Sequence, residues 1–225
     1  EIFTGEESKD EQIDKIISFV QDEIRYMGIE SGIGSIKPYA PQKVIKQRFG
    51  DCKDKSLLLV TLLKNIGIEQ AYPALVNVKM QHELDRLKPS NQLFNHCIAM
   101  FKHNNKEYWI DPTISLQGGS YKNMGCYDFG KALVVGLPAD SLQTIELQNS
   151  DTRIEMKEEI TVHSFTEPSV LKTKSTRYGM MADRRRSFLE YYSVNDLING
   201  IMEEMRKVYP SVKMTSDLRV EDDPE

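Results

Sequence analysis

The stretch that most constrains the fold runs from Arg48 to Gly67, and its second half is a helical segment with almost no polar face. Seven aliphatic residues make this pattern: Leu57, Leu58, Leu59, Val60, Leu62, Leu63 and Ile66. A helix that is hydrophobic nearly all round belongs inside a core. Asp51 is a good N-cap, and Gly67 is typical of the residue after a helix end. We therefore expect a buried central helix that begins beside Cys52.

Cys52 lies where this helix begins, and the positive end of the helix dipole favours the thiolate of a cysteine there. A lone cysteine is more often inert packing, so the functional interpretation depends on residues downstream. These are His96 in FNHCIAMF and Asp111 in YWIDPT. A cysteine at a helix start, followed by a histidine and an aspartate on neighbouring strands, is the arrangement used for nucleophilic acyl transfer.

The sequence HNNK at 103–106 predicts a hairpin whose two strands carry His96 and Asp111. Two registers are open. A loop at Asn104–Asn105 puts Ile98 opposite Asp111, and a loop one residue earlier puts His96 there. Either register places His96 and Asp111 on one face, adjacent or diagonal, within reach of each other.

Three segments together resemble the transglutaminase-like superfamily of papain-related cysteine enzymes, and within it the bacterial branch. They are RFGDCKDKSLLLVTLLKNIGIEQAYPALV at 48–76, NHCIAM at 95–100 and YWIDPT at 108–113. The resemblance covers about residues 10–140. It implies an α+β fold in which a central buried helix carrying the cysteine packs on an antiparallel sheet carrying the histidine and the aspartate. It also implies a nucleophile at Cys52, a base at His96 and an orienting carboxylate at Asp111.

Family members place an aromatic residue or a glutamine upstream of the cysteine to help hold the oxyanion, and Tyr26 is the candidate for that position. The alternative is that Tyr26 packs under the glycine-rich loop that follows it. Residues 79–95 show no clear period and lead directly to His96. They either border the cleft or form a short surface helix over 80–87.

The resemblance implies acyl transfer on a peptide or another amide through a thioester. Water as the acceptor makes a peptidase or amidase, and an amine makes a transglutaminase. We favour hydrolysis because the sequence shows no evident amine site. Two alternatives are a non-catalytic module that binds protein or cell wall on the same fold, and an exported structural domain whose C-terminal sheet mediates assembly. By resemblance we expect the bacterial periplasm or cell surface.

Charge and spacing argue against other classes of function. The net charge is −5, from 29 basic and 34 acidic residues, which gives no electrostatic footprint for nucleic acid. No apolar run approaches the ~20 residues of a membrane-spanning helix. The four histidines are scattered and no Cys-x-x-Cys occurs, so we expect neither a metal nor a cofactor. Of the three cysteines, Cys97 and Cys126 could pair, but two unpaired core thiols are the more frequent case.

The composition changes near residue 149, and we expect two parts: a transglutaminase-like catalytic core over residues 1–149 and a small α+β extension over 150–225. In the first part, Ser8 and Glu11 cap a helix that extends to residue 26. Pro73 marks the strand at 71–78 as an edge or a bulged start.

The extension is expected to contain strands at 154–162 and 170–179, helices at 181–192 and after Ser193, and a closing strand at 211–221. The chain opens without methionine. We therefore expect a processed product or a piece of a longer protein, with the extension as part of a larger domain.

Overall fold

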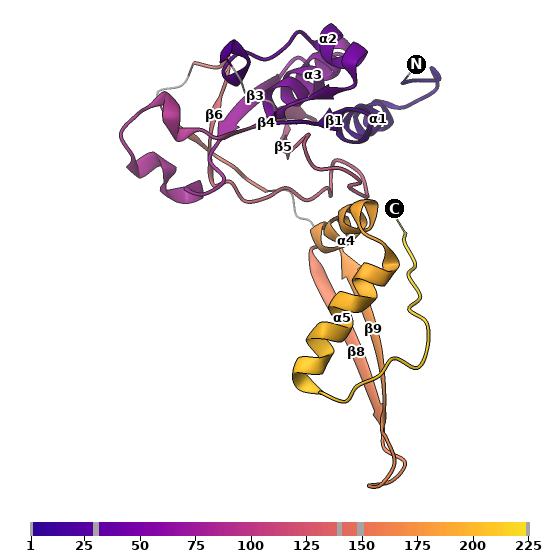
Figure 1. Ribbon diagram of the computed structural model, residues 1–225. Coiled ribbons are helices and arrows are strands. Elements are labelled where there is room, and N and C mark those ends of the chain that lie inside the picture. Colours follow the sequence, from indigo (N-terminus) through magenta and orange to yellow (C-terminus); the bar gives the residue numbers. More distant parts are fainter. Residues whose placement is uncertain (1, 29–31, 139–140, 148–150, 224–225) are drawn as a thin grey trace. The chain divides into compact units, whose positions relative to one another are not determined.

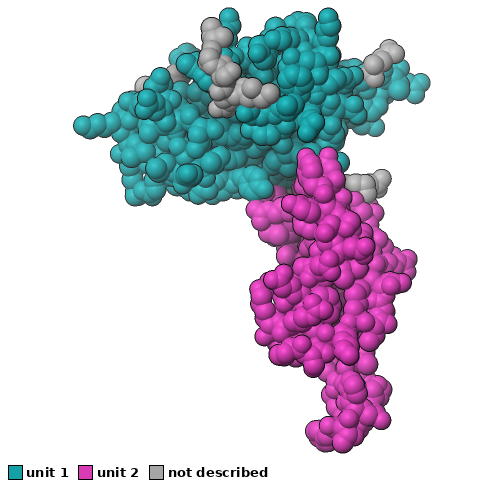
Figure 2. Space-filling view, viewed as in Figure 1, with its two compact units in different colours: residues 1–151 teal, residues 152–225 magenta. Residues whose placement is uncertain are grey.

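The structure is a computed structural model that describes residues 2–28, 32–138, 141–147 and 151–223. It divides the chain into two compact units, residues 1–151 and residues 152–225, which Figure 2 colours separately. The expected boundary between residues 149 and 150 lies outside the described residues, and the roles expected for the two parts remain predictions. Within the described ranges, no helix has both the length and the apolar character needed to cross a lipid bilayer.

Unit 1 begins with helix α1 (Lys9–Asp22), whose expected capping box between Ser8 and Glu11 is present. The helix ends before the expected residue 26. Arg25–Tyr26 instead forms strand β1, which pairs in parallel with β2 (Phe49–Gly50). A 3-10 helix, η1 (Gly32–Ser35), and helix α2 (Pro41–Gln47) lie between these two strands in the sequence.

Helix α3 (Cys52–Asn65) is the predicted central helix. Asp51 is its N-cap and forms a capping box with Asp54. Beyond the last turn, the N–H of Ile68 donates to the carbonyl of Leu63 at 3.0 Å. Gly67 adopts φ +87°, the left-handed conformation that only glycine adopts readily. The sequence thus defines both ends of this helix, and the prediction is confirmed.

Five antiparallel strands form the sheet on which α3 packs, in the order β5-β4-β3-β6-β7. They are β3 (Ala71–Val76), β4 (His96–His103), β5 (Lys106–Ile110), β6 (Lys131–Val134) and β7 (Gln143–Thr144). Helix α3 packs against β3 and β4, and α1 and α2 pack against α3 (Figure 1). The expected α+β fold, with the cysteine helix on an antiparallel sheet, is confirmed.

Strand β3 lies in the middle of the sheet, so the interpretation of Pro73 as the mark of an edge strand is wrong. Pro73 is opposite Ala99 of β4, and its carbonyl accepts from the N–H of Val135 at 2.8 Å on the other side. Its missing N–H therefore faces the point where β6 has ended. The proline removes at most one hydrogen bond, at the end of that ladder.

Both faces of the sheet are covered. One face packs against the three helices through Ala99, Phe101, Tyr108 and Ile110. The opposite face carries a second cluster, in which Trp109 is fully buried and Phe129 packs from the loop after β5. The two clusters hold the start of β4 and the end of β5, where His96 and Asp111 lie.

The hairpin between β4 and β5 takes the first of the two registers. His103 pairs with Lys106 and Ala99 with Ile110, so the loop is Asn104–Asn105. Both asparagines have positive φ, 51° and 62°, as a tight hairpin turn requires. The position opposite Asp111 is therefore that of Ile98, and His96 is the diagonal neighbour.

Residues 79–95 combine the two alternatives. They form two short 3-10 helices, η2 (Gln81–Arg86) and η3 (Asn91–Leu93), and Gln81 and Asn95 also line the cleft beside His96. Backbone and side-chain hydrogen bonds around Asn77 hold the start of this segment.

Unit 2 is a hairpin of β8 (Arg153–Thr161) and β9 (Val170–Tyr178), followed by α4 (Met180–Tyr191) and α5 (Val194–Val208). The capping box between Ser193 and Asp196 is present. The closing strand expected at 211–221 is wrong, because residues 211–221 form no strand. The described sheet of this unit consists of β8 and β9 alone.

Candidate active site

The structure brings His96 and Asp111 into direct contact. Nε2 of His96 lies 2.8 Å from an Asp111 carboxylate oxygen, and the two side chains are only 12 % and 4 % exposed. His96 is the first residue of β4, and Asp111 follows the last residue of β5. The hairpin therefore supplies both residues, and its register determines that they meet.

The Asp111 carboxylate is held on its other side by Thr113. Its second oxygen accepts from the Thr113 N–H at 2.9 Å and from the Thr113 hydroxyl at 2.7 Å. The Asp111 carbonyl accepts from the Gln21 side-chain amide at 3.0 Å. Since one carboxylate oxygen is already occupied, the other points at the His96 ring.

Cys52 is the first residue of α3 and also contacts the His96 ring. Burial of the ring lowers the pKa of His96, but hydrogen bonds to Asp111 and to the Cys52 sulfur outweigh this and raise the pKa to about 10. The ring is therefore an imidazolium at neutral pH. Because Nε2 is bonded to Asp111, Nδ1 is the nitrogen that can exchange a proton with the sulfur.

The start of α3 leaves one backbone donor unused. The Asp51 side chain accepts from the N–H groups of Lys53 and Asp54, and the Asp51 N–H donates to the Asp54 side chain. These bonds satisfy three of the four N–H groups that a helix start leaves unpaired. The fourth is the N–H of Cys52, which has no acceptor among the described residues. It is available for an oxyanion that forms next to the sulfur.

Tyr26 lies on β1, where it pairs with Gly50, two residues before Cys52. Its side chain is 47 % exposed and lines the same cleft as His96. Gly28, at the start of the loop that follows, lies beside the end of the Tyr26 ring, so the alternative that Tyr26 packs against this loop stays open. A role at the oxyanion remains a prediction.

A cleft of about 470 Å³ opens beside His96 and Asp111. Its other walls come from β1, from the segment between β3 and β4 and from the loop before β6, and comprise Tyr26, Val78, Gln81, Asn95, Tyr127, Asp128 and Phe129. At the rim, His82 lies 2.8 Å from the Asp128 carboxylate. Aromatic walls with a few polar groups are typical of a site that binds an organic substrate.

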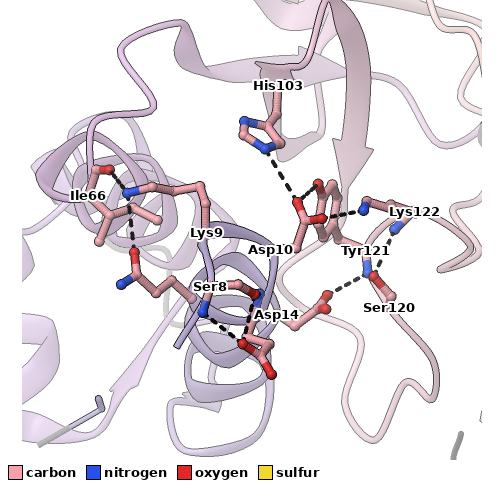
Figure 3. A network of polar contacts seen from close by, with 11 residues as sticks. Ser8, Lys9, Asp10, Asp14, Ile66, His103, Ser120, Tyr121 and Lys122 are labelled. Carbon is pink, nitrogen blue, oxygen red and sulfur yellow. Dashed lines mark hydrogen bonds and ion pairs between the residues drawn. The ribbon is translucent and has the colours of Figure 1, made fainter. Parts of the chain in front are cut away.

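The loop after Asp111 is tied back to α1 by a polar network, which Figure 3 shows. The Tyr121 hydroxyl donates to the Asp10 carboxylate at 2.7 Å, and the Tyr121 N–H donates to Asp14 at 2.6 Å. Lys122 also pairs with Asp10, and His103 lies 3.3 Å from it. The network holds the middle of the loop between β5 and β6, which also carries Tyr127 and Phe129.

Sequence reasoning missed four residues that hold the site: Gln21, Lys55, Ser56 and Thr113. Ser56 is fully buried, and its hydroxyl donates to the carbonyl of Cys97, next to His96, at 3.0 Å. For two of them the signal was a lysine and a serine directly before the leucine run, in the first two turns of a helix expected to be buried. Thr113 could have been found because a threonine two residues after an aspartate often bonds to it.

The other two cysteines differ from Cys52. All three are free thiols, and burial raises the pKa of Cys97 to about 12 and that of Cys126 above its usual range. Neither is therefore a nucleophile at neutral pH. Over the described part of the chain, no group of three or more His, Cys, Asp and Glu side chains is placed to hold a metal ion.

Residues 1–112 match the sequence model of a family described as the transglutaminase-like superfamily. None of the curated proteins matches the chain closely enough to count as a relative.

Two solved structures are similar to it. A candidate protease from Parabacteroides distasonis is 13 % identical, with a TM-score of 0.47, over 66 % of this chain and 26 % of its own. LapG of Legionella pneumophila, treated with EGTA, is 17 % identical, with a TM-score of 0.35, over 48 % of this chain and 54 % of its own. The chain thus spans about a quarter of the first structure and about half of the second.

Proposed function

This chain belongs to the transglutaminase-like superfamily, and we propose that unit 1 catalyses acyl transfer from a peptide or another amide through a thioester on Cys52. The observation that carries the proposal is the chain of contacts from Asp111 through His96 to Cys52. Cys52 would be the nucleophile, His96 the acid and base, and Asp111 the group that orients the ring.

The first half-reaction forms the thioester. With His96 protonated, the Cys52 sulfur reacts as a thiolate and bonds to the carbonyl carbon of the amide. The C–N bond then breaks, and the imidazolium gives its proton to the departing nitrogen. An amine leaves, and Cys52 carries the acyl group beside a neutral His96.

The second half-reaction releases the acyl group. A water molecule attacks the thioester carbon, and His96 accepts its proton. The C–S bond breaks, which restores the thiolate and the imidazolium and yields a carboxylic acid. In both halves the negative oxygen on carbon would be held by the Cys52 N–H, with Tyr26 as a candidate second donor.

The cleft supports a peptide as the substrate. Tyr26, Tyr127 and Phe129 offer aromatic surface for an apolar side chain, while Gln81 and Asn95 offer amide groups that can pair with a peptide backbone. We therefore propose that an extended peptide with an apolar residue near the scissile bond binds here.

An amine acceptor is the second candidate, favoured by the carboxylate of Asp128 in the cleft wall. Acidic groups attract protonated amines, but Asp128 is already paired with His82. Water needs no dedicated site, so hydrolysis is the first proposal and transglutamination the second.

The substrate is a complex mixture of peptides prepared from denatured proteins. It is incubated with the protein in the presence and in the absence of a fluorescent primary amine. Mass spectrometry then reads the products. Hydrolysis predicts new peptide termini, transglutamination predicts covalent amine on the peptides, and Cys52→Ala and His96→Ala abolish either. If the peptides are unchanged and no acyl group is trapped on Cys52, the proposal is wrong and the binding-module alternative takes its place.

A further inference from the structure

Lys55 is a buried charge one helical turn after Cys52. Its side chain is 1 % exposed, among Leu58, Leu59 and Ile24 in the core of unit 1. Burying an ammonium group is costly unless it is fully partnered, and an apolar residue could fill the same volume. The partners of Lys55 therefore indicate what this residue contributes.

Those partners are carbonyl groups at the end of α1. The Lys55 ammonium donates to the carbonyl of Gln21 at 3.1 Å and to that of Ile24. Carbonyls at a helix C-terminus lack partners within the helix, and a positive charge there is favoured by the helix dipole. The last turn of α1 has no basic residue of its own. Lys55 supplies that charge from α3.

The end of α1 reaches the candidate site by two routes. The Gln21 side chain donates to the backbone carbonyl of Asp111. The side-chain carboxylate of the same residue contacts His96. After Ile24 the chain continues into β1. The N–H groups of Arg25, in this strand, and of Met27, just after it, donate to the backbone carbonyls of Arg48 and Gly50, both at 2.9 Å. One ammonium group thus links the Cys52 helix to Asp111 and to the strand that carries Tyr26.

Two carboxylates face Lys55 from these elements, Asp22 at the end of α1 and Asp111 after β5. Burial lowers the pKa of Lys55 to about 8, while the two carboxylates oppose this shift. At neutral pH and below, Lys55 is therefore charged.

We propose that Lys55 is a positioning residue for the candidate triad. It holds the end of α1 and the Asp111 turn at a fixed place relative to the start of α3, so that His96 stays in contact with Cys52. The inference rests on the proposed pairing of Cys52 with His96, but it assigns a role to a residue that touches no reacting atom.

The test compares the rate of Cys52 alkylation by iodoacetamide across pH in five proteins: wild type, Lys55→Met, Gln21→Met, Lys64→Met and His96→Ala. The rate is followed on the Cys52 peptide by mass spectrometry. Methionine keeps the length and apolar stem of lysine and removes its charge. Lys64→Met is the matched control, because it removes a lysine from the exposed side of the same helix. Gln21→Met keeps Lys55 and removes only the side-chain bonds of Gln21, including the one to Asp111.

The inference predicts that the Lys55→Met curve moves toward that of His96→Ala. On the rising limb of the curve, a displacement of one pH unit lowers the rate at a given pH about tenfold. The alkylation curve of Gln21→Met should move in the same direction by a smaller amount. The curve of Lys64→Met should coincide with that of wild type. Thermal melting of each protein separates loss of stability from loss of positioning.

A purely structural role would lower the melting temperature of Lys55→Met and leave its alkylation curve on that of wild type, and this result would overturn the inference. If Lys55→Met does not fold, the Gln21→Met curve decides in the same way. Coincidence of the wild-type and His96→Ala curves is a different result. It would contradict the proposed function itself, whatever the Lys55 variant does.

Discussion

Nε2 of His96 lies 2.8 Å from the carboxylate of Asp111, across the diagonal of a hairpin whose loop is Asn104–Asn105. This contact leaves Nδ1 of the ring for Cys52 and, together with the bond to Cys52, raises the pKa of His96 to about 10 despite its burial. The charge state of the candidate site at neutral pH therefore depends on Asp111.

Asp111→Asn should lower the pH at which the His96 ring loses its proton. In wild type the ring is expected to remain an imidazolium through pH 8, as read from its nitrogen chemical shifts by NMR. Without the carboxylate, burial is opposed only by Cys52, so the proton is lost at lower pH. Asp128→Asn is the control, because it removes a carboxylate of the same cleft that pairs with His82 instead. An unchanged His96 titration in Asp111→Asn would contradict this account.

The same shift makes unit 1 less stable at high pH. The pKa of His96 in the folded protein lies above the ordinary value of about 6.5. The bound proton therefore stabilises the fold fully below about pH 6.5, and this contribution is lost as the pH rises toward 10. Urea denaturation of the wild type should show this loss, and His96→Gln should remove it. Parallel stability curves for the two proteins would be the contrary result.

Thr113→Val should weaken the hold on Asp111. The substitution removes the hydroxyl that donates to the carboxylate at 2.7 Å and keeps a similar volume. Hydrogen bonds to charged groups contribute about 1.5–3 kcal/mol, so the free energy of unfolding should fall by roughly that amount. Thr113→Ser keeps the hydroxyl, so its free energy of unfolding should fall by much less. Equal unfolding free energies for the Val and Ser variants, measured in urea, would refute the role assigned to the hydroxyl.

Tyr121→Phe should destabilise the network between α1 and the loop after Asp111. It removes the hydroxyl bonded to Asp10, while Lys122 and His103 still contact that carboxylate. We expect a loss of about 1 kcal/mol in the free energy of unfolding. Tyr39→Phe is the control: Tyr39 is 44 % exposed, and its change should stay within about 0.5 kcal/mol. A smaller loss for Tyr121→Phe than for the control would mean that the network adds no stability.

Tyr26→Phe tests the second oxyanion donor. With a peptide that the wild type cleaves, loss of one donor should lower kcat by up to about a hundredfold and leave KM nearly unchanged. If Tyr26 only lines the cleft, kcat stays constant, because phenylalanine keeps the aromatic surface. Steady-state kinetics of the two proteins decide between these roles.

Much of the fold was predictable because local signals agreed with each other. The capping types at Asp51 and Gly67 and the leucine run between them define α3 without reference to the rest of the chain. The turn sequence of the hairpin limited its register to two, and either one brings His96 near Asp111. The three residues of the candidate triad were therefore identifiable from sequence.

The failures depend on neighbours that a local pattern cannot reveal. Pro73 suggested an edge, yet β3 is central because the missing N–H falls where β6 has ended. A last strand was expected at 211–221, but β8 and β9 pair with each other and this segment pairs with neither. Lys55 was overlooked because its carbonyl partners lie more than thirty positions away in the sequence.

The most direct test of the central claim is the selectivity of alkylation among the three cysteines of the native protein. Cys52, Cys97 and Cys126 are 6 %, 3 % and 6 % exposed, so differences in labelling reflect reactivity more than access. Brief treatment with iodoacetamide at pH 7, followed by mass spectrometry of the three peptides, gives the ratio. The account predicts that Cys52 is labelled far ahead of the other two and that His96→Ala removes most of this preference. Equal slow labelling of all three, or the same preference in His96→Ala, would contradict the claim that His96 activates Cys52.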